Sequence, residues 1–150
     1  MLEMNLREVE EKICAACEKA NRRREEVTLI AVSKTKPVPT LEEFYNEGIR
    51  HFGENKVQEF LSKKDELHLD GVEKHLIGHL QSNKVKYIID KVCLIHSVDS
   101  VHLMDEIERQ AILHNIAEVQ ILIQVNISGE ESKFGIKPDE IEEFSKDNTG

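Results

Sequence analysis

The residue best placed for chemistry is Lys34. It follows the segment from Val27 to Val32, in which five of six residues are apolar, a pattern typical of a strand buried in a parallel sheet. Pro37 has no backbone N–H to donate and ends that strand. A partly desolvated lysine loses its proton more readily, and the neutral amine can form a Schiff base with a carbonyl, with Lys36 favouring the same proton loss. The position of Lys34 at a strand end is equally compatible with an ordinary surface lysine whose ammonium group reaches solvent.

Further polar and small residues follow the later apolar segments. The candidates for ligand contacts are Asn55, Gly78, His79, Ser97 and Asn126. Binding groups of parallel α/β folds gather at the carboxyl ends of strands, so these residues are expected on one rim with Lys34. A glycine there lets a flat ring approach the backbone, and the two asparagines can orient polar substituents. A plain turn for the glycine and a helix N-cap for Asn55 remain alternatives.

Two other kinds of site are less favoured by the spacing. His75 and His79 lie four residues apart, but Gly78 and the strand pattern keep them off one helix face, and no paired-cysteine or His-Glu-x-x-His motif occurs, so no metal site is expected. Cys14 and Cys17 have the spacing of a redox motif within a helical pattern. We interpret them as small buried or half-buried thiols.

Composition limits the remaining classes. The chain has 150 residues, which suits one domain, and its net charge of −9 argues against an extended nucleic-acid interface. No apolar run approaches a membrane span and no secretion signal begins the chain, so a cytoplasmic protein without membrane or nucleic-acid partners is expected.

Strand and helix patterns alternate five times along the chain, with no hairpin between strands. The expected strands are 27–32, 50–53, 75–78, 92–97 and 119–127, and the expected helices are 2–22, 40–48, and segments capped by Asn55, by Ser82 or Asn83, and by Asp99 or Ser100, with a possible sixth at 138–145. Thr40 to Glu43 suggests a capping box. This order predicts a parallel sheet with right-handed crossovers, and length alone favours an open doubly wound sheet.

Five motifs, in order, resemble the pyridoxal phosphate homeostasis protein family over about residues 5–144. They are Ala31–Pro37, Phe52–Glu59, His75–Lys84, Ile95–Asp99 and Gln124–Ile127. The resemblance implies an α/β fold, an incomplete (β/α) TIM-type barrel of the alanine-racemase N-terminal-domain kind with about five parallel strands. In that family the lysine at the position of Lys34 holds pyridoxal 5′-phosphate (PLP) as a Schiff base, and no catalytic turnover is securely assigned.

The resemblance also sets functional expectations for the chain as a single PLP-binding domain, residues 1–150. It implies a role in intracellular PLP homeostasis, with PLP-dependent apo-enzymes as partners. A PLP-dependent racemase or decarboxylase is the alternative, but no second domain supplies an opposing acid or base. The C-terminal strands and phosphate-binding turns of such barrels are expected to be missing, which would leave open sheet edges, weak PLP binding with little preference over pyridoxal, and self-association.

Overall fold

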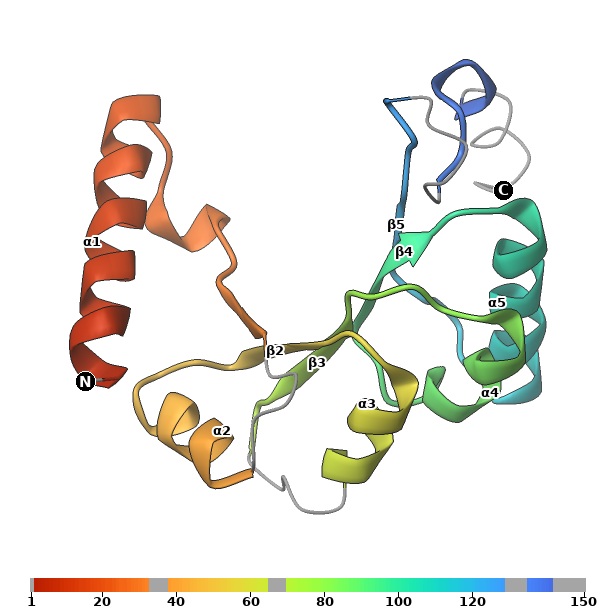
Figure 1. Cartoon of the computed structure of the whole chain (residues 1–150), viewed down its shortest axis with the longest axis horizontal. Coiled ribbons are helices and arrows are strands. Elements are labelled where there is room, and N and C mark those ends of the chain that lie inside the picture. The colour runs from red at the N-terminus through yellow and green to blue at the C-terminus, as the bar shows by residue number, and fades with distance from the viewer. Residues whose placement is uncertain (1, 33–37, 65–69, 129–134, 142–150) are drawn as a thin grey trace.

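The computed structural model describes residues 2–32, 38–64, 70–128 and 135–141, and their centre is one parallel sheet (Figure 1). The five strands are β1 (Ile30–Val32), β2 (His51–Glu54), β3 (Glu73–Leu76), β4 (Leu94–Val98) and β5 (Ile121–Ile123). Every adjacent pair is parallel. The predicted alternation of strands and helices is confirmed.

The order of the strands decides between the two predicted architectures. They lie side by side in sequence order, β1-β2-β3-β4-β5. A doubly wound sheet reverses its strand order at a switch point and carries helices on both faces. Figure 1 instead shows α3, α4 and α5 on one side of the sheet. The arrangement is that of an incomplete α/β barrel, as the resemblance implied.

Five α-helices and three 3₁₀ turns precede, connect and follow the described strands. They are α1 (Leu2–Ala20), η1 (Arg24–Glu26), α2 (Val38–Asn46), α3 (Val57–Lys64), η2 (Ser82–Lys84), α4 (Val85–Ile88), α5 (Val101–Leu113) and η3 (Pro138–Glu140). The Ser100 hydroxyl accepts from the Leu103 N–H at 3.1 Å, which confirms one of the two predicted caps of α5. The capping box at Thr40 is wrong, because α2 already begins at Val38.

Several elements are shorter than predicted. Strand β1 has three residues instead of six, and β5 keeps only Ile121–Ile123 of the expected 119–127. An isolated parallel bridge joins Val125 to Ile136 and extends the line of β5. The expected helix at 138–145 begins as a 3₁₀ turn, and residues 142–145 lie outside the described part.

Apolar side chains on one face of the sheet form the core. The larger cluster joins Leu76 and Ile95 of the sheet to Phe60 of α3, Ile88 of α4 and Ile107 of α5. A smaller cluster packs Phe52 of β2 against Leu41 of α2. Because successive strand residues point to opposite faces, the neighbours of Phe52, Leu76 and Ile95 must face away from these helices.

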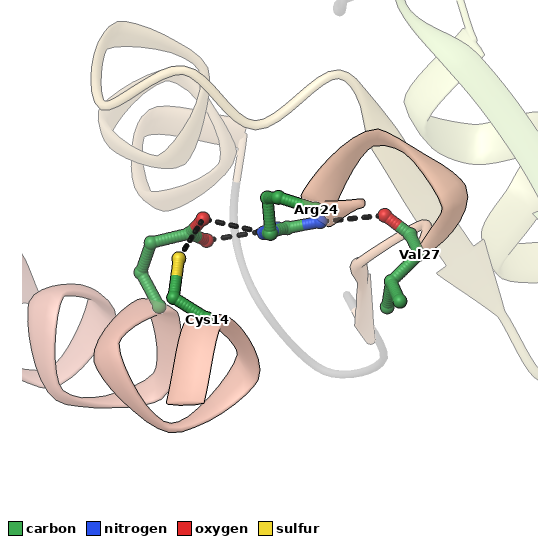
Figure 2. A network of polar contacts seen from close by, with 4 residues as sticks. Cys14, Arg24 and Val27 are labelled. Carbon is green, nitrogen blue, oxygen red and sulfur yellow. Dashed lines mark hydrogen bonds and ion pairs between the residues drawn. The ribbon is translucent and has the colours of Figure 1, made fainter. Parts of the chain in front are cut away.

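Helix α1 is tied to the 3₁₀ turn η1, which precedes the first strand, by one arginine. The Arg24 guanidinium donates to both Glu10 carboxylate oxygens, at 2.5 and 2.8 Å, and to the Val27 carbonyl at 2.6 Å (Figure 2). Cys14 also contacts Glu10, through Sγ at 3.8 Å. The cysteines are free: Cys17 is buried and Cys93 half-buried, but Cys14 is exposed, contrary to prediction. No helix in the described ranges is long and apolar enough to span a bilayer.

Candidate functional site

The carboxyl ends of the strands bring predicted residues to one edge. Val32, which ends β1, pairs with Gly53, and Gly53 pairs with His75 in β3. Asn55 follows two residues after Gly53, as Lys34 follows two residues after Val32 in the sequence. Lys34 itself lies outside the described residues. We call Asn55, Gly78, His79, Ser97 and Asn126 the carboxyl rim.

Three rim residues are joined at the centre of this edge. A Cβ atom on Gly78 would lie 2.1 Å from the Asn55 carbonyl oxygen, so only glycine allows the two backbones to approach this closely. The Gly78 carbonyl accepts the Ser97 hydroxyl at 2.6 Å, and Ser97 is buried. The loops after β2 and β3 are therefore fixed to the end of β4. These contacts give Gly78 and Ser97 structural roles, and contact with a ligand stays a prediction for both.

His79 forms a separate pair on the same rim. Its Nδ1 atom lies 3.3 Å from the Asp99 carboxylate, which follows β4. The His79 side chain is 40% exposed and that of Asp99 only 11%. Asp99 therefore positions an accessible imidazole. From the sequence, Asp99 was predicted only as a helix cap, although its motif placed it at a strand end.

Asn126 lies further along the edge. The chain after β5 first pairs with β4, through the Gln124 N–H and the Val98 carbonyl at 2.7 Å. The Asn126 N–H then donates to the Ile136 carbonyl at 2.8 Å, and its Oδ1 accepts from the Ser128 hydroxyl at 3.0 Å. The backbone therefore holds Asn126 in place beyond the end of β5, which pairs with the strand that carries Ser97.

A row of histidines that the sequence analysis did not predict crosses the opposite face of the sheet. His51 Nδ1 lies 3.0 Å from His75 Nε2, and His75 Nδ1 lies 2.9 Å from His96 Nε2. These residues come from β2, β3 and β4, and we call them the histidine row. Each of these histidines is next in sequence to a buried core residue. Because successive strand residues point to opposite faces, this pattern would have predicted that the three histidines share the other face of the sheet.

Burial and mutual repulsion keep the centre of this row neutral. Burial and the two flanking imidazoles lower the pKa of His75 to about 4, and burial also lowers the pKa of His96. Neutral His75 has one N–H and one lone pair, so it donates to one neighbour and accepts from the other. A cavity of about 780 Å³ adjoins the row and is also lined by Cys93, whose thiol pKa is raised to about 11 by burial and by Glu73.

The histidine row is a line, not a metal cage. Both ring nitrogens of His75 are used in hydrogen bonds, so its lone pairs do not converge with those of its neighbours on one point. Among the residues that the structure describes, no three His, Cys, Asp or Glu side chains are grouped to hold a metal ion.

Comparison of the sequence with known proteins gives consistent matches. The family model described as "Alanine racemase, N-terminal domain" matches residues 4–149. The pyridoxal phosphate homeostasis protein of Aquifex aeolicus is 47% identical over 139 residues, which cover 93% of this chain and 60% of that protein. The chain thus spans about 60% of the length of such curated relatives.

Solved structures agree with the fold. The crystal structure of an unknown protein from Bifidobacterium adolescentis matches with a TM-score of 0.86 and 33% identity, over 96% of this chain and 62% of that one. PipY from Synechococcus elongatus, in a structure with PLP bound, matches with a TM-score of 0.70 and 34% identity, over 90% of this chain and 63% of that one.

Proposed function

Because this chain belongs to the alanine racemase N-terminal domain family, we propose that it binds PLP covalently at Lys34 and serves in PLP homeostasis as a carrier without catalytic turnover. The observation that carries the proposal is the convergence of Asn55, Gly78 and Ser97 on the edge where β1 ends, two residues before Lys34 in the sequence. The names of the relatives and PLP in the PipY structure support it.

The rim has the chemistry that a small polar aromatic cofactor requires. When bound, PLP would supply an aldehyde that forms a carbon–nitrogen bond with a primary amine. Asn55 is half-buried and presents an amide for a ring substituent. Ser97 and Gly78 fix the wall beside it through their 2.6 Å hydrogen bond. His79, held by Asp99, can donate to or accept from a polar group at the mouth of the site.

A carrier of PLP needs fewer catalytic groups around the cofactor than a PLP-dependent enzyme does. A racemase needs acid and base groups on both faces of the ring, and a decarboxylase needs a site that orients the scissile bond. In the described residues, the rim offers one accessible imidazole, that of His79. We therefore propose that the chain holds and releases PLP, and that PLP-dependent apo-enzymes receive it.

The test is reductive trapping followed by peptide mapping. The protein is incubated with PLP and reduced with borohydride, and the modified peptide is identified by mass spectrometry. We expect the pyridoxyl group on Lys34. The Lys34→Arg variant, which keeps the charge but not the nucleophile, should lose the absorbance of bound PLP, whereas Lys36→Arg should keep it. Modification at another lysine in the native protein would refute the proposal.

Two further measurements define the activity. Incubation of the loaded protein with single enantiomers of amino acids should give no racemisation or decarboxylation, and turnover that depends on Lys34 would favour the enzyme. Parallel titrations with PLP and pyridoxal test the expectation of weak binding with little preference for the phosphate. Strong selectivity for PLP by a monomer would show that these 150 residues contain a phosphate site.

A further inference from the structure

A groove between α3 and α4 begins at the carboxyl rim, with which it shares His79. It has a volume of about 490 Å³. Val57 and Leu61 of α3 form half-buried apolar surface in it, and Tyr87 of α4 forms a wall that is 44% exposed. Figure 1 shows the two helices next to each other, and they are in contact.

The charge of this groove is opposite in sign to the net charge of the chain. The whole protein carries a net charge of −9, yet the described lining residues include Lys56 and Lys84 and no acidic residue. The ammonium groups of Lys84 and Lys86 lie 5.9 and 5.2 Å from the centre of the Tyr87 ring. Within the described ranges, no carboxylate is ion-paired with any of these three lysines. The lining residue His79 contacts a carboxylate, that of Asp99, at 3.3 Å.

The position of the groove links it to the rim. Lys56 directly follows Asn55, and His79 directly follows Gly78. The backbones of Asn55 and Gly78 are in close contact, so the two sides of the groove begin from one fixed point. A ligand lying in the groove would have one end at the mouth of the proposed cofactor site.

We propose that this groove docks a short, extended acidic segment of a protein that receives the cofactor. The inference rests on the proposed function and names the surface on which that partner would bind. Lys56 and Lys84 come from opposite sides of the groove, so they can pair with successive carboxylates. An apolar residue of the segment would cover Val57, Leu61 and the exposed part of the Tyr87 ring.

A peptide fits better than a nucleic acid. Phosphodiester chains are recognised by long basic faces, whereas this groove is short and lies on an acidic protein. At physiological salt, charges more than about 8 Å apart are largely screened, so the acidic rest of the surface does not repel a few carboxylates held inside the groove. A long polyanion would extend over that acidic surface and be repelled by it.

The test is fluorescence polarisation with labelled peptides and the complete chain. The probe is fluorescein-labelled Glu-Glu-Leu-Phe-Glu-Glu, and its neutral match is Gln-Gln-Leu-Phe-Gln-Gln. We expect binding of the acidic peptide alone, weakening from about 50 mM to about 500 mM NaCl. The double variant Lys56→Ala/Lys84→Ala should bind about tenfold more weakly, the size expected for two exposed charge pairs.

The control removes the same charge elsewhere. Lys12→Ala/Lys19→Ala takes two exposed lysines from α1 and should leave peptide binding unchanged. Equal weakening by both double variants would overturn the inference, since attraction would then be unspecific. Displacement of the peptide by an equal concentration of inorganic phosphate, or of a short oligouridine, would also overturn it in favour of a small-anion or nucleic-acid site.

Absorbance titration with PLP separates this inference from the proposed function. Lys56→Ala/Lys84→Ala should bind PLP as the native protein does while losing the peptide. A protein that binds PLP but not the peptide would refute the docking groove alone. A protein that binds the peptide but leaves Lys34 unmodified by PLP would refute the cofactor proposal alone.

Discussion

The carboxyl rim and the histidine row share strands β2, β3 and β4, with Asn126 of the rim following β5, but they are held together in different ways. The rim depends on backbone proximity, because a carbonyl of Asn55 fills the place of a Gly78 side chain. The row depends on side chains, through two imidazole contacts of 3.0 and 2.9 Å. Substitutions that add atoms should damage the rim most, whereas a change of protonation should damage the row.

The difference also concerns accessibility. His79 on the rim is 40% exposed, but His75 in the row is only 4% exposed. A ligand can therefore reach the first imidazole, while the second is kept neutral by its surroundings. We infer that the row supports the sheet from the side opposite the helices, and that the rim is where chemistry with a cofactor would take place.

The largest expected effect is that of Gly78→Ala. Its Cβ would meet the Asn55 carbonyl oxygen at 2.1 Å, and backbone has little freedom to move there. We expect a loss of about 3 kcal/mol in the free energy of unfolding, measured with urea, together with loss of PLP binding by any folded fraction.

Gly53→Ala is the matched control on the neighbouring strand. Its Cβ would meet side-chain atoms of Ile30 and Ile77 at 3.1 Å, and these can shift. The cost should be about 1 kcal/mol. Equal losses for the two variants would mean that the backbone contact of the rim is not special.

The second prediction concerns pH and the histidine row. The folded pKa of His75, about 4, lies below its unfolded value of about 6.5, so the unfolded chain binds the proton more tightly. The stabilisation is present above pH 6.5 and is lost as the pH falls toward 4. Between pH 7 and pH 5 this one group should cost about 2 kcal/mol of unfolding free energy.

The control for this pH effect is His75→Gln, which removes the titrating group and keeps a hydrogen-bonding side chain. Urea unfolding at a series of pH values should give a shallower slope for the variant between pH 7 and pH 5. Parallel slopes for the two proteins would contradict the assignment of the proton to the row.

The sequence predicted the rim better than the row for a physical reason. Asn55, Gly78 and Ser97 follow apolar segments, and parallel strands end at one edge whatever their exact register. The row depends on register, because His51, His75 and His96 meet only when β2, β3 and β4 are staggered as observed. In the sequence the obvious neighbour of His75 is His79, four residues away, but the partners of His75 in the structure lie 24 and 21 residues away.

The element boundaries were predicted less well than the fold. Strand β1 covers only Ile30–Val32, since apolar side chains from Val27 onward indicate burial but not ladder hydrogen bonds. Helix α2 begins at Val38 rather than at Thr40 and carries Pro39 in its first turn, where the missing backbone N–H has no helical partner to lose. The sequential strand order also could not follow from length, which favoured an open doubly wound sheet.

The third prediction separates a stabilising contact from a cofactor contact on the rim. Ser97→Ala removes the hydroxyl that donates to the Gly78 carbonyl at 2.6 Å and should cost about 1 kcal/mol of unfolding free energy. Ser100→Ala removes the cap of α5 and should cost a similar amount, about 1 kcal/mol. Only the Ser97 variant should weaken PLP binding in an absorbance titration. Equal weakening by both would attribute the loss to stability alone.

The smallest effect on stability is expected for the two asparagines of the rim. Asn126 is held mainly by its backbone, whose N–H donates to the Ile136 carbonyl at 2.8 Å, and that bond survives replacement of the side chain. Asn55 is half-buried and contacts Gly78 through its backbone carbonyl, which alanine also supplies. Asn55→Ala and Asn126→Ala should each cost at most about 1 kcal/mol in urea unfolding, the scale of a lost cap.

Cofactor binding should respond more strongly than stability to these two changes. If the amides orient PLP, each variant should alter the absorbance spectrum or the affinity of bound PLP while its unfolding midpoint stays near that of the native protein. A variant that unfolds outright, with an unchanged spectrum in its folded fraction, would move that asparagine from the proposed site to the framework that supports it.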